Sequence, residues 1–381
     1  MVEVEDEVVL DAVPEQVPDR YSLECWSWQD RKVESVTKRS ELMKTVITRC
    51  FALVAMAGLS IAAEAPGFKV TKKFPVPGNG GFDYIVFESS SNRLYVSHGT
   101  EVDVLDADSG KILGKIEDTP GVHGIAIVPN LHRGFTTNGA NGTVSVFDTN
   151  TFKTIKKISV PADPDFVFYD SGTKRVLVCH GDAAAITAID PDKEAVIGKV
   201  DLGGGAEAAV VNGKGTGFVN LEEASTVVSF DPNALTTKNK WPITGCKTPT
   251  GLAMDDSNSR LFIGCRSKVL AVMDANDGKV IETLPIGDHV DAVAFDRQDK
   301  LIFASNGEGT ISVIKENGPD NYQSLGEIPT QQSAKTMAFD PKTKRLFLSA
   351  AEMEQSPAID GKRGRMRPKP GTFTVLVVER Q

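Results

Sequence analysis

A segment of about 42 residues recurs along most of this chain, and it constrains the possible folds more than any other feature. An Asp that ends a short alternating run recurs at spacings of 42, 42, 41 and 43 residues. Within one unit, residues 121–161, four such runs lie at 125–128, 134–137, 143–147 and 154–160, separated by Gly, Pro, Asn and Asp. Period-2 alternation between turn residues is typical of short strands. Four strands per repeat of this length predict an all-β fold, a β-propeller.

The repeat predicts seven blades. The first strands of the units are expected to start at Asp83, His123, Asp165, Glu207, Thr250, Asp291 and Lys335, at spacings of 40 to 44 residues. The last unit, residues 333–381, contains only three expected strands, at 336–339, 345–349 and 372–378. Residues 68–76 resemble the fourth strands of the other units. We therefore expect an N-terminal strand to complete the last blade and close the ring, which leaves no open sheet edge.

The residues before the repeats are expected to fall into two parts. Residues 1–42 are acidic and lack a sustained period, which predicts a non-native or dispensable extension. Residues 43–65 have a basic start (Lys44, Arg49), an apolar run at 50–59 and small residues around Ala62, which is the pattern of a cleaved signal peptide. The alternative is an internal core helix preceded by an ordered N-terminal domain. A signal peptide predicts a periplasmic or secreted protein, with the propeller at 66–381 and no transmembrane segment in the mature form.

Three stretches resemble a known family: NRLYVSHGTEVDVLDADSGKILG, RGFTTNGANGTVSVFDTNTFK and RLFIGCRSKVLAVMDANDGKVIETLPIG. They are similar to the YVTN-repeat β-propellers, specifically the YncE-like exported proteins, and the resemblance runs from residue 68 to the C-terminus. It implies a seven-bladed propeller but carries little information on chemistry. Single-stranded DNA binding is associated with YncE-like proteins. After residue 65, however, the chain has 35 basic and 39 acidic residues and no basic groove with spaced aromatic side chains, so nucleic acid is not favoured as a partner.

Polar residues are expected to gather on one face of the disc. Strand direction alternates within a blade. The start of a first strand and the end of the second strand therefore lie on the same face of the disc. Because first strands line the central channel, their starts should ring its mouth, and the ends of second strands should lie slightly further out. The ligand-binding residues predicted in this way are Asp83, His98, His123, Asn138, Asp165, His180, Glu207, Asn220, Asp291, Asn306 and Lys335. Thr250 and Cys265 occupy equivalent positions, and His289 lies in the loop before Asp291.

Four carboxylates in one ring raise each other's pKa unless a cation compensates. Lys335, the histidines or a divalent metal ion could do so, and we name Asp165, Glu207 and His123 as the candidate metal ligands. Carboxylates with amide oxygens suit calcium, whereas imidazoles with a carboxylate suit zinc or copper. A water-filled polar channel mouth without a ligand is the competing interpretation.

Two other polar features have a simpler interpretation. The recurring Asp106, Asp148, Asp190, Asp231 and Asp274 precede tight turns, where an Asp side chain accepts hydrogen bonds from the backbone two residues on. Residues 351–371 form a long basic insertion in the last unit, which either folds over the acidic ring or projects into solvent.

These features predict a monomeric binding or scaffold protein that recognises a small molecule or an envelope protein through the channel mouth. The alternative is a metal-assisted hydrolase, lactonase or lyase at the same mouth. No pair of nucleophile and base can be identified from spacing, because a propeller site is assembled from distant residues. Of the three cysteines after residue 65, Cys246 and Cys265 are expected at the same end of one blade and are predicted to form a disulfide, which leaves Cys179 free.

Overall fold

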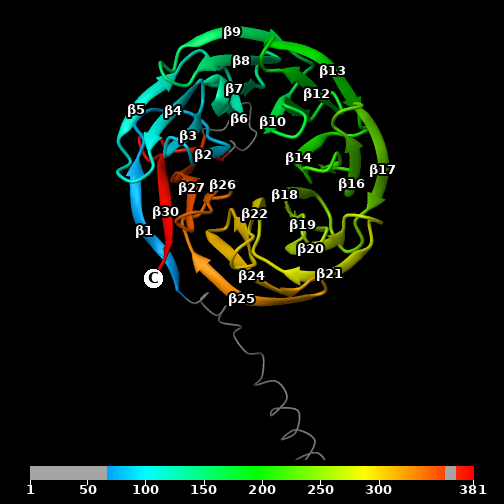
Figure 1. Ribbon diagram of the computed structural model, residues 1–381. Coiled ribbons are helices and arrows are strands. Elements are labelled where there is room, and N and C mark those ends of the chain that lie inside the picture. The colour runs from blue at the N-terminus through cyan, green and yellow to red at the C-terminus, as the bar shows by residue number, and fades with distance from the viewer. Residues whose placement is uncertain (1–66, 357–365) are drawn as a thin grey trace, which may run out of the picture. The chain divides into compact units, whose positions relative to one another are not determined.

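The computed structural model describes residues 67–356 and 366–381, which lie within one compact unit, Ala62–Gln381. Seven four-stranded antiparallel sheets stand around a central axis as the blades of a β-propeller (Figure 1). The expectation of an all-β, seven-bladed propeller is confirmed. The helical structure of the described residues is one 3₁₀ turn, η1 (Pro129–Leu131).

Blades one to three follow the chain in order. Blade one contains β2 (Ile85–Glu88), β3 (Arg93–His98), β4 (Glu101–Asp106) and β5 (Ile112–Ile116). Blade two contains β6 (Val122–Val128), β7 (Arg133–Asn138), β8 (Thr143–Asp148) and β9 (Thr154–Ser159). Blade three contains β10 (Pro164–Asp170), β11 (Arg175–His180), β12 (Ala185–Asp190) and β13 (Ala195–Asp201).

Blades four to six repeat this arrangement. Blade four contains β14 (Ala206–Val211), β15 (Gly217–Leu221), β16 (Thr226–Asp231) and β17 (Thr236–Pro242). Blade five contains β18 (Pro249–Asp255), β19 (Arg260–Cys265), β20 (Val269–Asp274) and β21 (Val280–Pro285). Blade six contains β22 (Val290–Asp296), β23 (Leu301–Asn306), β24 (Thr310–Gly318) and β25 (Asn321–Pro329).

Blade seven combines the two ends of the propeller. It contains β26 (Met337–Asp340), β27 (Arg345–Ala350), β30 (Thr374–Arg380) and, outermost, β1 (Phe68–Pro75). β1 pairs antiparallel with β30 from Phe68 opposite Arg380 to Pro75 opposite Thr374, and Figure 1 shows the two strands side by side. The expected closure by an N-terminal strand is therefore confirmed, and the pairing removes the open edge of β30.

The hydrophobic core lies between neighbouring blades. Second and third strands are buried on both faces, as in β3 and β4, whereas fourth strands such as β9 are largely exposed. Large aromatic residues on second and third strands fill much of the space between sheets. The fully buried examples include Phe135, Phe147, Phe218, Phe230, Phe262, Phe303 and Phe347. Such residues let twisted sheets pack at the density of a protein interior.

The recurring aspartates stabilise turns, as the sequence predicted. Asp148 Oδ1 accepts hydrogen bonds from the backbone N–H groups of Asn150 (3.0 Å) and Thr151 (2.8 Å), and Asp106, Asp190, Asp231 and Asp274 make equivalent bonds. The hydrogen bond from the Thr151 N–H holds the pKa of Asp148 below its ordinary value. These five carboxylates serve the turns and lie outside the polar face.

Innermost strands change register where they approach the channel mouth. In β6, β10, β14, β18 and β22 the pairing with the second strand skips a residue, for example between Val122 and Ile125 opposite Asn138 and Thr136. Each skipped segment contains the residue that the sequence places in the ring. A β-bulge changes the direction of the side chain within it. The side chain at this one position per blade therefore departs from the regular alternation of side chains between the two faces of the strand.

The predicted extension at 1–42 and the predicted signal peptide at 43–65 lie outside the described residues, as does the centre of the blade-seven insertion, 357–365. Across the remaining chain, no helix has the length and apolar character needed to span a membrane. The described ends of the insertion form a hairpin, β28 (Met353–Gln355) paired with β29 (Met366–Pro368).

Candidate functional site

Three residues from three consecutive blades form the closest group at the channel mouth. His123 Nδ1 lies 2.8 Å from Asp83 Oδ2 and 3.6 Å from Asp165 Oδ1. The side chains of His123, Asp83 and Asp165 are 35%, 20% and 22% exposed, so solvent reaches a site that is mostly enclosed by protein. The hydrogen bond with Asp83 raises the pKa of His123 above its ordinary value, although burial opposes this effect.

Lys335 and Arg266 supply positive charge at the mouth. Lys335 Nζ contacts Asp291 Oδ2 directly and lies 3.8 Å from Asp83 Oδ1. Arg266 Nη2 lies 3.3 Å from Asp291 Oδ1, while its Nη1 lies 2.9 Å from Glu222 Oε1. Burial opposes the charged form of Lys335, but Asp291 and Asp83 outweigh it and raise the pKa of the ammonium group. Lys335 therefore joins Asp83 and Asp291 into one charged network.

Glu207 and Asp165 titrate far from their ordinary range. Burial raises the pKa of Glu207 to about 10, assisted by a hydrogen bond with Glu222 and by the charge of Asp165. Burial likewise raises the pKa of Asp165 to about 7, with Asp83 adding to the effect and His123 opposing it. With a pKa of about 10, Glu207 holds its proton at neutral pH and can donate it in the hydrogen bond with Glu222. This is how several carboxylates can occupy one ring, as expected from their mutual repulsion.

The predicted residues at the ends of second strands are not part of the open mouth. His98, Asn138, His180, Asn220 and Asn306 are all buried. Most bond within their own blade: His98 Nδ1 to Asp103 (2.9 Å), Asn138 Nδ2 to Ser145 (2.9 Å), His180 Nε2 to Thr187 (2.9 Å) and Asn306 Nδ2 to Ser312 (2.9 Å). Asn220 Nδ2 donates to the carbonyl of Thr250 in the next blade (2.9 Å). His98 Nε2, Asn220 Oδ1 and Asn306 Oδ1 are buried and have no hydrogen-bond partner among the described residues, so a ligand-binding role for these positions stays a prediction.

Two positions depart from the repeat geometry. In blade four, the sequence pattern predicted that the second strand ends at Asn220. The residue opposite Ala206 is Leu221, so this strand ends one residue later. Thr250 occupies the ring position of blade five but is buried, and its hydroxyl donates to the Val290 carbonyl (2.8 Å). The ring of polar side chains therefore has six members: Asp83, His123, Asp165, Glu207, Asp291 and Lys335.

Sequence reasoning missed three residues of the mouth. Arg266 and Glu222 directly follow the second strands of blades five and four, at the position that is glycine in Gly139, Gly181 and Gly307. This replacement of a repeated glycine by a charged residue is a signal that the sequence offered. Tyr84 is the third, and its ring is tilted by 58° relative to that of Phe166, with the ring centroids 5.3 Å apart. Burial raises the pKa of Tyr84 well above its ordinary value, and Asp165 adds to the shift.

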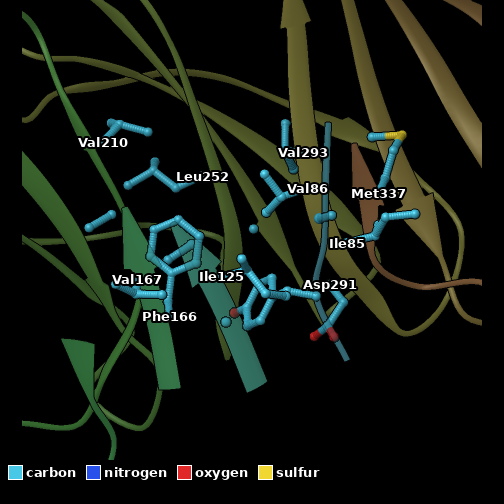
Figure 2. Close-up of a pocket in the computed structure, with 16 residues that line it drawn as sticks. Ile85, Val86, Ile125, Phe166, Val167, Val210, Leu252, Asp291, Val293 and Met337 are labelled. Atoms are coloured by element: carbon cyan, nitrogen blue, oxygen red, sulfur yellow. The ribbon is translucent and has the colours of Figure 1, made fainter. Parts of the chain in front are cut away.

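An apolar cavity of about 180 Å³ lies in the channel itself. Figure 2 shows that its labelled side chains come from the first strands of all seven blades and face one common space. Phe166, Leu252 and Val293 are among them, and Asp291 is its acidic member. The charged residues of the mouth therefore border an apolar interior, whose lower dielectric strengthens their interactions.

Two further cavities open at the mouth and differ in character. A cavity of about 390 Å³ lies between the ring and the hairpin β28–β29, and its lining includes Arg266, Asp291, Lys335, Met353 and Met366. The base of the insertion thus borders the mouth. A cavity of about 370 Å³ lies between blades three and four, and its charged lining residues are all acidic: Asp163, Asp165, Asp182, Glu207, Glu222 and Glu223.

The residues with suitable geometry for a metal ion differ in part from the predicted set. The ligand atoms of Asp83, His123 and Asp165 all lie within 4.8 Å of one another. Glu207, the third residue of the predicted set, is outside this group. His98, Glu101 and Asp103 form a second cluster, but Lys115 Nζ lies 3.4 Å from Asp103 Oδ1 and also contacts Glu101, so a lysine already neutralises it.

Cys246 and Cys265 form a disulfide with a Cα–Cα distance of 5.6 Å, and the remaining cysteine of the described residues, Cys179, is free and buried. The bond connects the loop that enters blade five with the end of the second strand of that blade. Cys265 is therefore removed from the list of polar groups at the mouth.

Comparison with known proteins supports the fold. No protein-family model matches the chain, and no curated protein matches its sequence. A solved structure described as Kuenenia stuttgartiensis hydrazine synthase is similar with a TM-score of 0.63 and 15% identity, over 72% of this chain and 94% of that one. The structure of U3-55K is similar with a TM-score of 0.67 and 10% identity, over 82% of this chain and 99% of that one. The chain is thus a seven-bladed β-propeller, and at these identities the likeness extends to the fold alone.

Proposed function

We propose that this chain is an exported, YncE-like binding propeller that holds a cationic ligand at its channel mouth. The supporting observation is the acidic cavity between blades three and four, whose charged lining residues are all carboxylic acids. Among the described residues, Asp163, Asp182, Glu207 and Glu223 form no ion pair with Lys, Arg or His. Burial, with neighbouring carboxylates adding to the effect, raises the pKa of Glu207 and Asp165, and a bound cation would compensate the negative charge that burial disfavours.

Export is the second part of the proposal. It is supported by the signal-like segment at 43–65 and by the Cys246–Cys265 disulfide, since structural disulfides persist in oxidising compartments. The mass of the mature protein isolated from cell envelope or culture medium should correspond to cleavage near Ala62. A full-length protein that remains in the cytoplasm would contradict export.

Calorimetric titration of the full-length chain with the polyamine spermidine tests the binding role. Spermidine should bind in low salt and more weakly at 0.5 M NaCl, because salt screens charge interactions. The double variant D182N/E223Q removes two cavity carboxylates that have no ion-pair partner and should lose about tenfold in affinity. The variant D192N, which removes an exposed carboxylate in the turn after β12, is the matched control. Equal affinities in all three proteins, or no binding, would contradict the proposal.

A metal-assisted hydrolase, lactonase or lyase is the second candidate function. The cluster of Asp83, His123 and Asp165 favours it, because one imidazole and two carboxylates can hold a catalytic metal ion. Hydrolysis of p-nitrophenyl acetate and of γ-butyrolactone, assayed with and without Zn²⁺, tests this function. Turnover that requires zinc and disappears in D165N would support an enzyme, and no turnover would leave the binding role.

A further inference from the structure

We propose that Asp83, His123 and Asp165 form a binding site for a divalent transition-metal ion, for which Zn²⁺ is the reference probe. This inference deepens the proposed function, since it specifies a cation for the same mouth. It also replaces Glu207 with Asp83 in the set of ligands that the sequence suggested.

The distances in the group fit a small metal ion. A tetrahedral zinc ion with bonds of about 2.0–2.1 Å separates its ligand atoms by roughly 3.3 Å. His123 Nδ1 lies 2.8 Å from Asp83 Oδ2 and 3.6 Å from Asp165 Oδ1, and all three ligand atoms lie within 4.8 Å of one another. The two distances from His123 Nδ1 therefore match this separation to within about half an ångström.

An unsatisfied oxygen atom points to a bound cation. Asp165 Oδ1 is buried and has no hydrogen-bond partner among the described residues, and it is the same atom that faces His123 Nδ1. A buried acceptor without a donor costs free energy of folding. A metal ion in the place of the Nδ1 proton would bind Asp165 Oδ1, Asp83 Oδ2 and the imidazole together.

The backbone on both sides of the group is held in place. The Thr336 hydroxyl donates to the Asp83 carbonyl (2.5 Å), and the Thr137 hydroxyl donates to the Asp165 carbonyl (2.5 Å). Because both threonines come from neighbouring blades, the two carboxylates are fixed relative to His123 by the ring itself. A preorganised first shell of this kind is what a metal site requires.

Gly139 sets the orientation of the imidazole. A Cβ atom at position 139 would lie 2.7 Å from His123 Nε2, so the ring can occupy this place only beside a glycine. The ring is thereby directed with Nδ1 toward both carboxylates. A nitrogen with two carboxylate oxygens suits zinc better than calcium, which takes six to eight oxygen ligands. The fourth position of the ion remains available for water.

Zinc titration of the full-length chain after treatment with EDTA tests the site. The wild-type protein should bind one Zn²⁺ at the mouth, and D165N and D83N should each weaken binding at least about 100-fold, since even groups outside the first shell cost 10–100-fold. The variant D192N, which changes an exposed carboxyl in the turn after β12, is the matched control. The variant E207Q tests whether a ring carboxyl outside the group contributes to zinc binding. Substitution with Co²⁺ provides an independent readout through the visible absorption of a tetrahedral ion, and circular dichroism verifies the fold of each variant.

Each outcome decides one point. Loss of zinc affinity in D165N and D83N, with wild-type affinity in D192N and a smaller effect in E207Q, supports the assigned ligands. Equal loss in E207Q would overturn the assignment of Asp83 in place of Glu207, and wild-type affinity in D165N would overturn the site. Spermidine binding without zinc binding would refute the metal site and leave the proposed function standing. Zinc binding without spermidine binding would support the metal site and refute the proposal that the mouth holds an organic cation.

Discussion

Lys335 Nζ, in the last blade, lies 3.8 Å from Asp83 Oδ1, in the first blade. This contact crosses the seam at which β1 closes the propeller, so the charged network of the mouth and the closure of the ring depend on each other. The core at the seam shows the same dependence, because Phe74 of β1 packs with Leu94 of blade one and Phe347 of blade seven. Changes to β1 should therefore affect both the stability of the propeller and the mouth.

Removal of β1 should abolish cooperative folding. A truncated chain beginning at Asn79 loses the partner of β30 and exposes an unpaired strand edge, which favours aggregation. A chain beginning at Ala65 retains β1 and should unfold at the same temperature as the full-length protein. Size-exclusion chromatography and thermal unfolding monitored by circular dichroism compare the two. A soluble, cooperatively unfolding monomer that starts at Asn79 would show that the closure is dispensable.

Glu207 should make the propeller less stable as the pH rises. Its pKa is about 10 in the folded protein, so the stability that its proton provides is complete below the ordinary pKa near 4.5 and is lost as the pH rises toward 10. In the variant E207Q the side chain keeps its size and can still donate a hydrogen bond, but it has no proton that titrates. It should be more stable than the wild type by about 1–3 kcal/mol at pH 8 and equal to it near pH 4. Urea unfolding at both pH values measures the difference.

A difference between E207Q and wild type that does not depend on pH would contradict the protonated state of Glu207. The variant E282Q changes a carboxyl on an outer strand and serves as the control. Its stability should follow that of the wild type across the same range.

The disulfide should leave one free thiol. Thiol titration of the mature protein under denaturing, non-reducing conditions should detect Cys179 alone, whereas three thiols would reject the Cys246–Cys265 bond. The sequence separation of the pair is 19 residues. Loss of a loop of this size in C246A/C265A should lower the free energy of unfolding by about 3 kcal/mol.

Gly139 should be intolerant of a side chain. In G139A the added methyl group collides with His123 and should cost about 1–3 kcal/mol of stability. In G318A, where nothing lies within 4 Å of the added atom, stability should be unchanged. Chemical denaturation compares the variants. Equal stability of both would mean that His123 does not occupy the position over Gly139.

The sequence predicted the fold well because each blade contains the complete pattern of its own strands and turns. The 42-residue spacing predicted seven units, and the shortage of one strand in the last unit predicted the role of residues 68–76, of which β1 comprises 68–75. Position in the repeat also identified six members of the ring at the mouth. It failed where a blade departs from the repeat, as at Asn220, whose strand ends one residue later at Leu221.

The chemistry of the site was less predictable, because it depends on side-chain direction. His98 and His180 belong to the same repeat position as Asn138, yet whether such residues face the channel or their own blade is decided by packing. The pairing of Asp83 rather than Glu207 with His123 follows from the order of blades around the ring. Asp83 and Asp165 lie in the two blades that flank His123, whereas Glu207 is one blade further away.

Anomalous diffraction at the zinc absorption edge is the most direct test of the cation site at the mouth. Crystals of the full-length protein grown with Zn²⁺ should show one strong anomalous peak at the mouth, within bonding distance of His123 Nδ1 and of carboxylate oxygens from Asp83 and Asp165. A zinc-loaded crystal with no anomalous peak at the mouth, or with peaks confined to other surface carboxylates, would contradict the account.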